Sequence, residues 1–597
     1  SHNGGTTANA LSPTKKKPGP SRGKQHIAVL DLIVSKLAFN LRAWVPDKGG
    51  GATDSSSKAS GAASTLIAKR ALLLLHTMSV GVRRSTSSLS SKGSREQFST
   101  GKMLLQSRVL CNLLANASIN NISYFRHPKN GSERSVFFNS LMHILCMQMV
   151  NTPANARFTL FMRFVAPLEK TMAAMIEFAQ KGNNLRNPGI RSTLSSWCRD
   201  VLGICTAAKT RQTYALVFEW LVPAPSAGAP GKMQLLAAAL KSFADDPFVT
   251  TPVLKLIADV VHNRGHRIAF PPSSSNGYVL CRYAATCISR YCEALAVAVP
   301  GGGGKVAQQQ QQQQQQQAAG AFQIGMGPGQ DRYKMRFKGL GFCMNAMAHL
   351  LNGSYVNFGI MELYGDKTLS NARDAIIQLA LSVDPNDLLS YPKTSLAFFL
   401  LMDALAIKDV HAIVSLPTPL YARLLSSVMI VIQRPVEESA FAASVIDRLM
   451  TYRFECEACV ASDQIEHASG EGASAADAST VQNRAKKHDA WGKLQQHEAA
   501  HPTALVEMLK AIFQLVAFQN CTRQWSMSRP LLPLILSLAG FWDKWHKQII
   551  AEQPAQRQQQ FTAAFAKLTD QVDRTLATKN RDRFTKQLYN AVRLIKS

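Results

Sequence analysis

Apolar residues recur every three or four positions along most of the chain, which is the spacing of one face of an α-helix. Alternation with a period of two, which is typical of a half-buried strand, is rare. The helical spacing is clear after Val253 and again near the end of the chain, at Leu256, Ile257, Val260, Val261, Phe561, Phe565, Leu568, Val572, Leu576, Phe584, Leu588 and Ile595. The pattern therefore predicts an all-α protein.

Each predicted helix has one apolar stripe that it cannot bury alone. Short breaks rich in Pro, Gly and Asn, such as Asp384-Pro385-Asn386, separate the helices. Stacking the helices in pairs would bury the stripes against one another. The chain has 597 residues, enough for about ten to twelve helix pairs of about forty to forty-seven residues once loops are removed. We therefore predict an α-solenoid.

Four segments lack the large apolar side chains that would offset the entropy cost of ordering the backbone. We predict that they are disordered, and they are the basic leader 1–24, the Gly/Ser/Ala-rich stretch 49–64, the Gly/Gln-rich insertion 301–330 and the polar stretch 461–490. The helical repeats are then expected at 25–300, 331–460 and 491–597.

The chain is strongly basic, with 67 Lys and Arg against 38 Asp and Glu and a net charge of +29. Such a charge favours acidic partners, although no nucleic-acid recognition motif with interleaved aromatic residues accompanies it. We therefore do not expect direct nucleic-acid binding, and a helical scaffold for nucleic acid or other acidic partners stays an alternative. The eleven scattered cysteines suit a reducing cytosol or nucleus. No apolar stretch is long enough for membrane insertion.

The segment HEAAH, from His497 to His501, matches a zinc-protease motif. In that motif two histidines four residues apart bind zinc, and the glutamate, here Glu498, acts as the base. Pro502 follows directly, however, and the residue before a proline is pushed out of helical dihedrals. The flanking segment is polar, and no third ligand follows at a recognised spacing. A zinc hydrolase is therefore a remote alternative, and we expect His497→Ala to leave thermal stability nearly unchanged.

Two other motifs are weaker. CEAC, from Cys456 to Cys459, has metal-knuckle spacing but no second pair, so two buried helical thiols explain it better. GGGGK, from Gly301 to Lys305, lacks the Ser or Thr of a phosphate loop, so it indicates a linker. We therefore predict that the protein is not an enzyme, with no catalytic residues, no metal site and no cofactor.

Six segments, in order along the chain, closely resemble the exportin-7 family of Ran-binding nuclear export receptors in the importin-β (karyopherin) superfamily. They are FEWLVP (218–223), TTPVLKLIADVVHNRGHRIAF (250–270), LNGSYVNFGIMELYGD (351–366), DLLSYPK (387–393), QWSMSRPLL (524–532) and TKNRDRFTKQL (578–588). The resemblance extends over nearly the whole chain, is looser before about Asp200, and is to the C-terminal half of the receptor. Because the chain starts at Ser1 without a methionine, we expect it to be a fragment of a longer protein.

The resemblance implies a HEAT-repeat α-α superhelix that binds Ran-GTP together with protein cargo in the nucleus. It also implies passage through the nuclear pore complex, contact with nuclear pore proteins, and release in the cytoplasm after GTP hydrolysis. The family makes its principal Ran contact in N-terminal repeats that are not matched here, so no partner-binding residue is assigned. The Gly/Gln-rich insertion and the strongly basic charge depart from the family pattern.

Within this resemblance, the segment QWSMSRP, from Gln524 to Pro530, is interpreted as a corner between two repeat helices. Apolar runs at helical spacing lie on both sides of it, and Pro530 suits the first turn of the second helix. We predict that Trp525 and Met527 pack inside, and that Arg523 or Arg529 bonds carbonyl groups at the end of the preceding helix.

Overall fold

The computed structural model describes most of the chain. The described residues are 130–150, 152–222, 231–297, 333–469 without Pro435, 478–596 without Asn520 and Thr522, together with Asp331 and short pieces between 32 and 125. All regular structure in these ranges is helical, which confirms the all-α, helical-repeat class. The segments 1–24, 49–64 and 301–330, predicted to be disordered, lie outside the described residues.

The helices belong to two compact units, which are described separately. The first unit contains 1–173 and 199–208, and the second contains 174–198 and 209–597. None of the described helices is long and apolar enough to cross a membrane. Two of the helices, α7 (Ala154–Gln180) and α8 (Pro188–Ala207), contribute residues to both units.

In the first unit, α6 (Gly131–Val150) packs against the end of α8 at very close range. The Ser135 hydroxyl donates to the Arg199 carbonyl over 2.7 Å, and the Asn139 amide donates to the Gly203 carbonyl over 3.1 Å. A Cβ atom on Gly203 would lie 2.3 Å from the Ser135 carbonyl oxygen. This approach of two helix backbones therefore requires glycine at position 203.

A buried ion pair fastens the same two helices. The Arg134 guanidinium binds both carboxylate oxygens of Asp200, with Nε to Oδ1 at 2.8 Å and Nη2 to Oδ2 at 2.6 Å. A third donor of Arg134 reaches the carbonyl of Phe125 over 3.1 Å. Arg134 is 8% exposed and Asp200 is 1% exposed, so each charge depends on the other for its compensation.

The second unit contains the remaining helices, which begin with α9 (Arg211–Leu221), α10 (Lys232–Ser242), α11 (Pro247–Val260), α12 (Asn276–Val297), α14 (Lys338–Asn352), α15 (Phe358–Leu363), α16 (Thr368–Leu381), α17 (Pro385–Leu389) and α18 (Pro392–Lys408). They continue with α19 (Val410–Val414), α20 (Thr418–Ile432), α21 (Glu438–Ser469), α22 (Ala478–Ala500), α23 (Ala504–Ala517), α24 (Gln524–Ser528), α25 (Leu531–Ser537), α26 (Ala539–Ala551), α27 (Ala555–Thr569) and α28 (Thr578–Lys596). A π-helical turn (Tyr333–Phe337) precedes α14, and a short 3-10 turn (Arg264–His266) follows α11.

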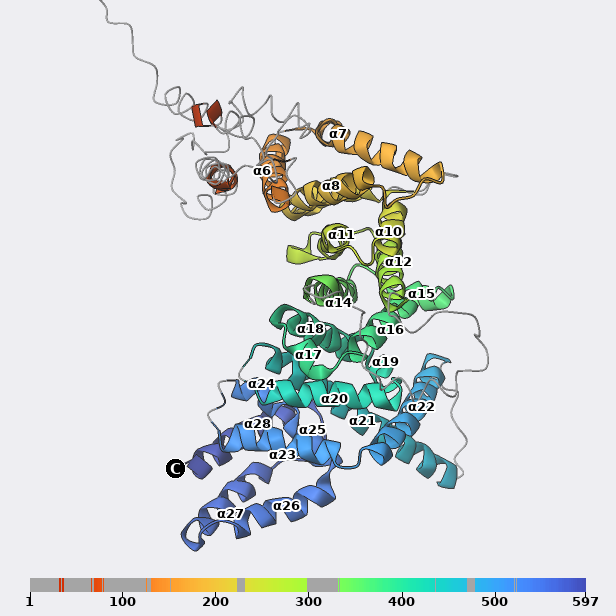
Figure 1. Cartoon of the computed structure of the whole chain (residues 1–597). Helices are drawn as coiled ribbons and strands as arrows, with labels where there is room; N and C mark the ends of the chain where they lie inside the picture. Colours follow the sequence, from red (N-terminus) through yellow and green to blue (C-terminus); the bar gives the residue numbers. More distant parts are fainter. Residues whose placement is uncertain are drawn as a thin grey trace, which may run out of the picture. The chain divides into compact units, whose positions relative to one another are not determined.

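These helices form two parallel rows. One row is α10, α12, α16 and α20, and the other is α11, α14, α18 and α21; within each row every helix packs on the next one (Figure 1). Contacts between α10 and α11 and between α12 and α14 join the rows. Each apolar stripe is therefore covered by helices that are close in sequence, as in a helical-repeat solenoid. The predicted core positions Leu256, Ile257 and Val261 are all buried.

The stretch that follows α11 ties three helices together through polar contacts with the backbone. The Tyr214 hydroxyl donates to the Val260 carbonyl over 2.7 Å, and the Tyr355 hydroxyl donates to the Val261 carbonyl over 2.9 Å. The Asn263 amide donates to the carbonyl of Gly353 over 2.7 Å. Arg267, which is 1% exposed, donates to the His262 carbonyl over 3.1 Å and stacks over the Tyr214 ring. These contacts fix the relation between α9, α11 and the end of α14.

The prediction of a disordered segment at 461–490 is wrong at both of its ends. Helix α21 continues to Ser469, and α22 begins at Ala478. The two helices pack side by side, and ion pairs join them, including Lys487 with Glu455 over 3.3 Å and Arg484 with Asp463 over 3.3 Å. Charged side chains thus face one another along the two helices, and α22 also buries Ala490 and Leu494.

The end of the chain returns to α21. On α28, the Arg581 guanidinium donates to the carboxylate of Asp447 over 2.6 Å and to the hydroxyl of Thr451 over 2.5 Å. Val572 and Leu576 show helical spacing in the sequence, but α27 ends at Thr569, and they lie in the connection to α28. The C-cap residue of α27, Asp570, has an extended backbone, and Gln571, with a φ of +56°, completes a tight turn in which the Val572 amide donates to the Thr569 carbonyl over 3.2 Å.

We predict that Asp200→Ala lowers the free energy of unfolding by about 3 to 5 kcal/mol, because it leaves the Arg134 cation buried without its carboxylate. Asp245→Ala is the matched control, because Asp245 pairs with Arg186 over 2.5 Å where both side chains are about half exposed. We expect less than about 1 kcal/mol for the control. Urea denaturation followed by circular dichroism compares the two, and equal losses would contradict the assignment.

Candidate partner-binding site

His497 and Glu498 of the HEAAH motif make contacts inside the fold. His497 is 4% exposed on α22; its Nε2 donates to the Val414 carbonyl over 2.9 Å, and its Nδ1 accepts from the Thr418 hydroxyl over 3.0 Å. The ring stacks on Tyr421 with centroids 4.2 Å apart. Burial lowers the pKa of His497, so the ring is held neutral. Both ring nitrogens therefore bind groups of the protein, and this burial does not fit the expectation that His497→Ala leaves thermal stability nearly unchanged.

The other two residues of the motif have different surroundings. Glu498 binds Arg453 through both oxygens, over 2.7 and 3.1 Å. His501 is exposed and follows the last residue of α22, Ala500, which confirms its predicted position at a helix end. The motif therefore joins α22 to α19, α20 and α21 instead of presenting two imidazoles to one ion.

The CEAC cysteines differ in their surroundings. Cys456 is fully buried, and burial is the main cause that raises the pKa of its thiol to about 11. Such a thiol is protonated at neutral pH and is a poor nucleophile. Cys459 is half-buried. The interpretation as buried helical thiols therefore holds for Cys456 and only in part for Cys459.

The segment from Gln519 to Pro530 is a corner between α23 and α25, with the short α24 inside it. Met527 is 2% exposed, as predicted, but Trp525 is 63% exposed, so the prediction that it packs inside is wrong. The Arg523 guanidinium does bond a carbonyl, that of Glu437 over 2.6 Å, but this residue lies just before α21 and not at the end of α23. The corner thus leaves a tryptophan on the surface.

Trp525 is part of a surface hollow that we call the aromatic groove. The groove has a volume of about 440 Å³ and lies between α24 and α28; it is lined by Gln524, Trp525, Ser528, Asp582, Thr585, Lys586, Leu588 and Tyr589. Tyr589 is 61% exposed. Two exposed aromatic rings beside a lysine can hold an apolar side chain of a partner together with a neighbouring carboxylate.

The charges around the aromatic groove are mostly positive. Lys586 lies one turn before Tyr589 on α28, Arg593 lies one turn after it, and Arg529 follows α24; all three are exposed. Asp582 is the acidic residue in the lining. This arrangement favours an acidic segment over a basic one.

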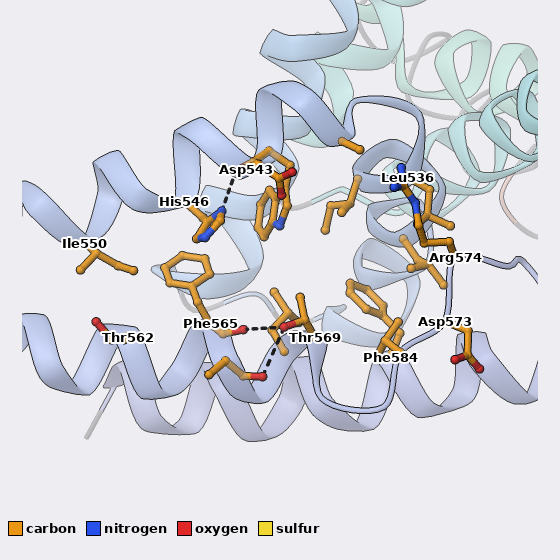
Figure 2. Close-up of a pocket in the computed structure, with 17 residues that line it drawn as sticks. Leu536, Asp543, His546, Ile550, Thr562, Phe565, Thr569, Asp573, Arg574 and Phe584 are labelled. Atoms are coloured by element: carbon orange, nitrogen blue, oxygen red, sulfur yellow. Dashed lines mark hydrogen bonds between the residues drawn. The ribbon is translucent and has the colours of Figure 1, made fainter.

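A second hollow of about 460 Å³ lies between α26 and α27, near the start of α28 (Figure 2). Its walls include Trp542, Phe565 and Phe584, which are buried. The His546 ring donates through Nδ1 to the Trp542 carbonyl over 2.8 Å, and the Thr569 hydroxyl is turned to the carbonyl of Phe565 over 3.4 Å. The His546 and Thr569 side chains therefore bond the backbone, and the lining also contains the charged residues Asp543, Asp573 and Arg574. This hollow is a less suitable partner site than the aromatic groove, since its rings are covered.

The sequence contained a signal for one of the two exposed rings. The apolar stripe of α28 runs through Phe584, Leu588 and Ile595, which are all buried, and Tyr589 falls off that stripe. An aromatic residue off the stripe is a candidate for the surface. Trp525 gave no such signal, because a helix of five residues has too few positions to define a buried face.

Comparison with known proteins shows similarity over most of the chain. It is 28% identical over 463 residues to Exportin-7-B of Xenopus laevis, with 76% of this chain and 37% of that protein covered. It is 27% identical over 458 residues to Ran-binding protein 17 of Homo sapiens, with the same shares covered. Exportin-7 of Dictyostelium discoideum is 23% identical over 561 residues, which cover 94% of this chain and 46% of that protein.

The chain matches only part of each relative. It spans less than half the length of each of these curated proteins, and no family model matches it. The similarity agrees with the resemblance seen in the sequence, and it is to a partial region of exportin-7-like proteins.

We predict that His497→Ala lowers the free energy of unfolding by about 2 to 4 kcal/mol, since it removes a buried ring and leaves the Val414 carbonyl and Thr418 hydroxyl without their partner. His501→Ala is the matched control, because it removes the exposed histidine of the same motif, and it should change that free energy by less than about 0.5 kcal/mol. Urea denaturation of both variants measures this, and equal effects would contradict the buried role.

The pH dependence gives a second measurement of the same ring. A histidine whose pKa is lowered by folding takes up its proton more readily in the unfolded chain, so its contribution to stability is lost as pH falls below about 6.5. The loss of stability on acidification in that range should be smaller in His497→Ala than in the unmodified chain. Denaturant midpoints measured between pH 7.5 and pH 5.5 test this, and parallel curves for the two proteins would show that the ring is not held neutral.

Proposed function

We propose that this chain forms part of a nuclear export receptor that binds protein cargo together with Ran in its GTP state. The observation that carries the proposal is the similarity, over 76% of the chain, to proteins named exportin-7 and Ran-binding protein 17. The proposed receptor shuttles between nucleus and cytoplasm through the pore complex and contacts nuclear pore proteins on the way. No chemical reaction is assigned to it.

The architecture supports a binding role. In the second unit, two rows of helices present long surfaces whose residues come from many successive repeats. Solenoids of this kind bind partners over extended surfaces and do not need a single reactive centre. The motif that best suggested an enzyme, from His497 to His501, is occupied by contacts within the fold.

We select the aromatic groove as a contact surface for a protein partner. Exposed tryptophan and tyrosine side chains are the residues that most often carry binding energy at protein interfaces. Lys586 and Arg593 flank Tyr589 on α28, and the chain as a whole carries a net charge of +29. The chemistry therefore favours an acidic segment of the partner with one large apolar side chain.

Nucleic acid is the second candidate partner, because the same net charge of +29 would attract phosphates. The two candidates differ in what holds them. Phosphate contacts release counterions, so nucleic-acid affinity falls steeply with salt. A peptide held by two aromatic rings should depend less on salt and more on the rings.

We predict that Ran binds at least tenfold more tightly, about 1.4 kcal/mol, in its GTP state than in its GDP state to a protein in which this chain is joined to the rest of an exportin-7 relative. The 597-residue chain alone should bind Ran weakly at best. Titration calorimetry with GDP and with a non-hydrolysable GTP analogue measures both. Equal affinity of the joined protein for the two states would contradict the receptor proposal.

The aromatic groove is tested with a short acidic peptide that has one central Phe. Fluorescence anisotropy measures the binding of this peptide to the chain. Trp525→Ala should weaken its binding about 30-fold, about 2 kcal/mol, and leave stability unchanged because the ring is exposed. Tyr364→Ala is the control, since Tyr364 is 78% exposed and lies outside the groove.

A single-stranded oligonucleotide of equal net charge is the comparison probe. If it binds more tightly than the peptide, with a steep salt dependence and no effect of Trp525→Ala, then the nucleic-acid alternative holds and the groove assignment fails. The Ran experiment is independent of this result.

A further inference from the structure

A cysteine, an aspartate and a histidine come together on the hairpin of α21 and α22, away from the aromatic groove. Cys459 and Asp463 lie one turn apart on α21, and His488 faces them from α22. One possible ligand atom from each residue lies within 4.8 Å of the other two. The His488 Nε2–H donates to Asp463 Oδ2 over 2.6 Å. Figure 1 shows these two helices beside each other.

The two helices of this cluster are the ones that carry the CEAC and HEAAH motifs. Neither motif, however, supplies two residues to the cluster. Cys459 is the second cysteine of CEAC, whereas its first cysteine, Cys456, is buried. His488 lies on the helix that carries HEAAH, whereas His497 is bonded to Val414 and Thr418. Folding therefore combines one thiol and one imidazole that are far apart in the sequence.

The types of ligand suit a transition metal. Thiolate, imidazole and carboxylate groups are the usual ligands of Zn²⁺, and three protein ligands leave a fourth position for water. The Asp463 side chain is 16% exposed and that of His488 is 44% exposed, so the cluster is open to solvent on one side. An ion and its water ligand can therefore reach it.

Arg484 supplies the kind of outer contact that metal sites use. Its guanidinium lies 3.3 Å from Oδ1 of Asp463, whereas Oδ2 faces His488. One carboxylate oxygen can thus bind the metal while the other stays paired with Arg484, which fixes the orientation of the carboxylate. The positive charge of Arg484 weakens cation binding, but the aspartate and a thiolate together supply two negative charges.

We propose that Cys459, Asp463 and His488 bind one divalent transition-metal ion, with Zn²⁺ as the preferred ion and water as the fourth ligand. The ion takes the place of the hydrogen bond between His488 and Asp463 and joins α21 to α22. Binding displaces the thiol proton of Cys459 into solvent, while His488 binds as the neutral ring. This site departs from the sequence prediction that the protein has no metal site.

The test uses the 597-residue chain after dialysis against a chelator, with Co²⁺ and then Zn²⁺ as probes. We expect one Co²⁺ per chain, with visible bands of a four-coordinate ion and a near-ultraviolet band from the thiolate, all removed by one equivalent of Zn²⁺.

Variants assign the ligands. Cys459→Ser should remove the thiolate band and weaken Zn²⁺ binding at least tenfold, and His488→Gln should weaken it similarly. The matched controls Cys521→Ser and His501→Ala, whose side chains lie elsewhere, should bind as the unmodified chain does. Circular dichroism checks that all four variants keep their helices. The proposal is overturned if the unmodified chain binds no Co²⁺ at millimolar concentration, or if Cys459→Ser keeps the thiolate band.

Discussion

The long helices of the two rows in the second unit have apolar side chains that another helix must cover, and this constraint determines how the rows are built. The rows α10–α12–α16–α20 and α11–α14–α18–α21 satisfy it with helices close in sequence. Between α21 and α22, whose sequences are more polar, ion pairs add to the packing contacts. Side chains that this packing leaves exposed, such as Trp525 and Tyr589, can contact partners.

Helical spacing was enough to predict the class of fold and much of the core, because burial of a stripe leaves a direct trace in the sequence. Leu256, Ile257 and Val261 are examples. The polar stretch at 461–490 was misjudged because ion pairs between α21 and α22 leave no such trace. The charges that face Asp463 or Glu455 can be known only once the two helices are placed side by side.

The candidate sites follow the same division. His497 was judged from its polar neighbours in the sequence, whereas its actual partners, Val414, Thr418 and Tyr421, come from segments far before it. The metal-type cluster combines Cys459 with His488, which no spacing rule connects. The exposure of Tyr589 could be predicted, because the ring lies outside the apolar stripe of α28. The exposure of Trp525 could not, because it depends on how the short α24 packs against its neighbours.

The segments that carry the family resemblance have a physical role in the fold. The stretch 250–270 contains Asn263 and Arg267, whose side chains bond carbonyl groups at the ends of helices, and Tyr355 in 351–366 bonds the Val261 carbonyl. Side chains of this kind fix the angle between successive repeats more exactly than apolar contacts do, because a hydrogen bond requires a particular direction.

The contact between Arg581 and Asp447 also has a consequence for folding during synthesis on the ribosome. The two residues are 134 positions apart, so α21 is made long before the helix that pairs with it. At a synthesis rate of about 5 to 20 residues per second, Arg581 is added about 7 to 27 seconds after Asp447. The pair between Arg581 and Asp447 therefore forms only after α28 has left the exit tunnel.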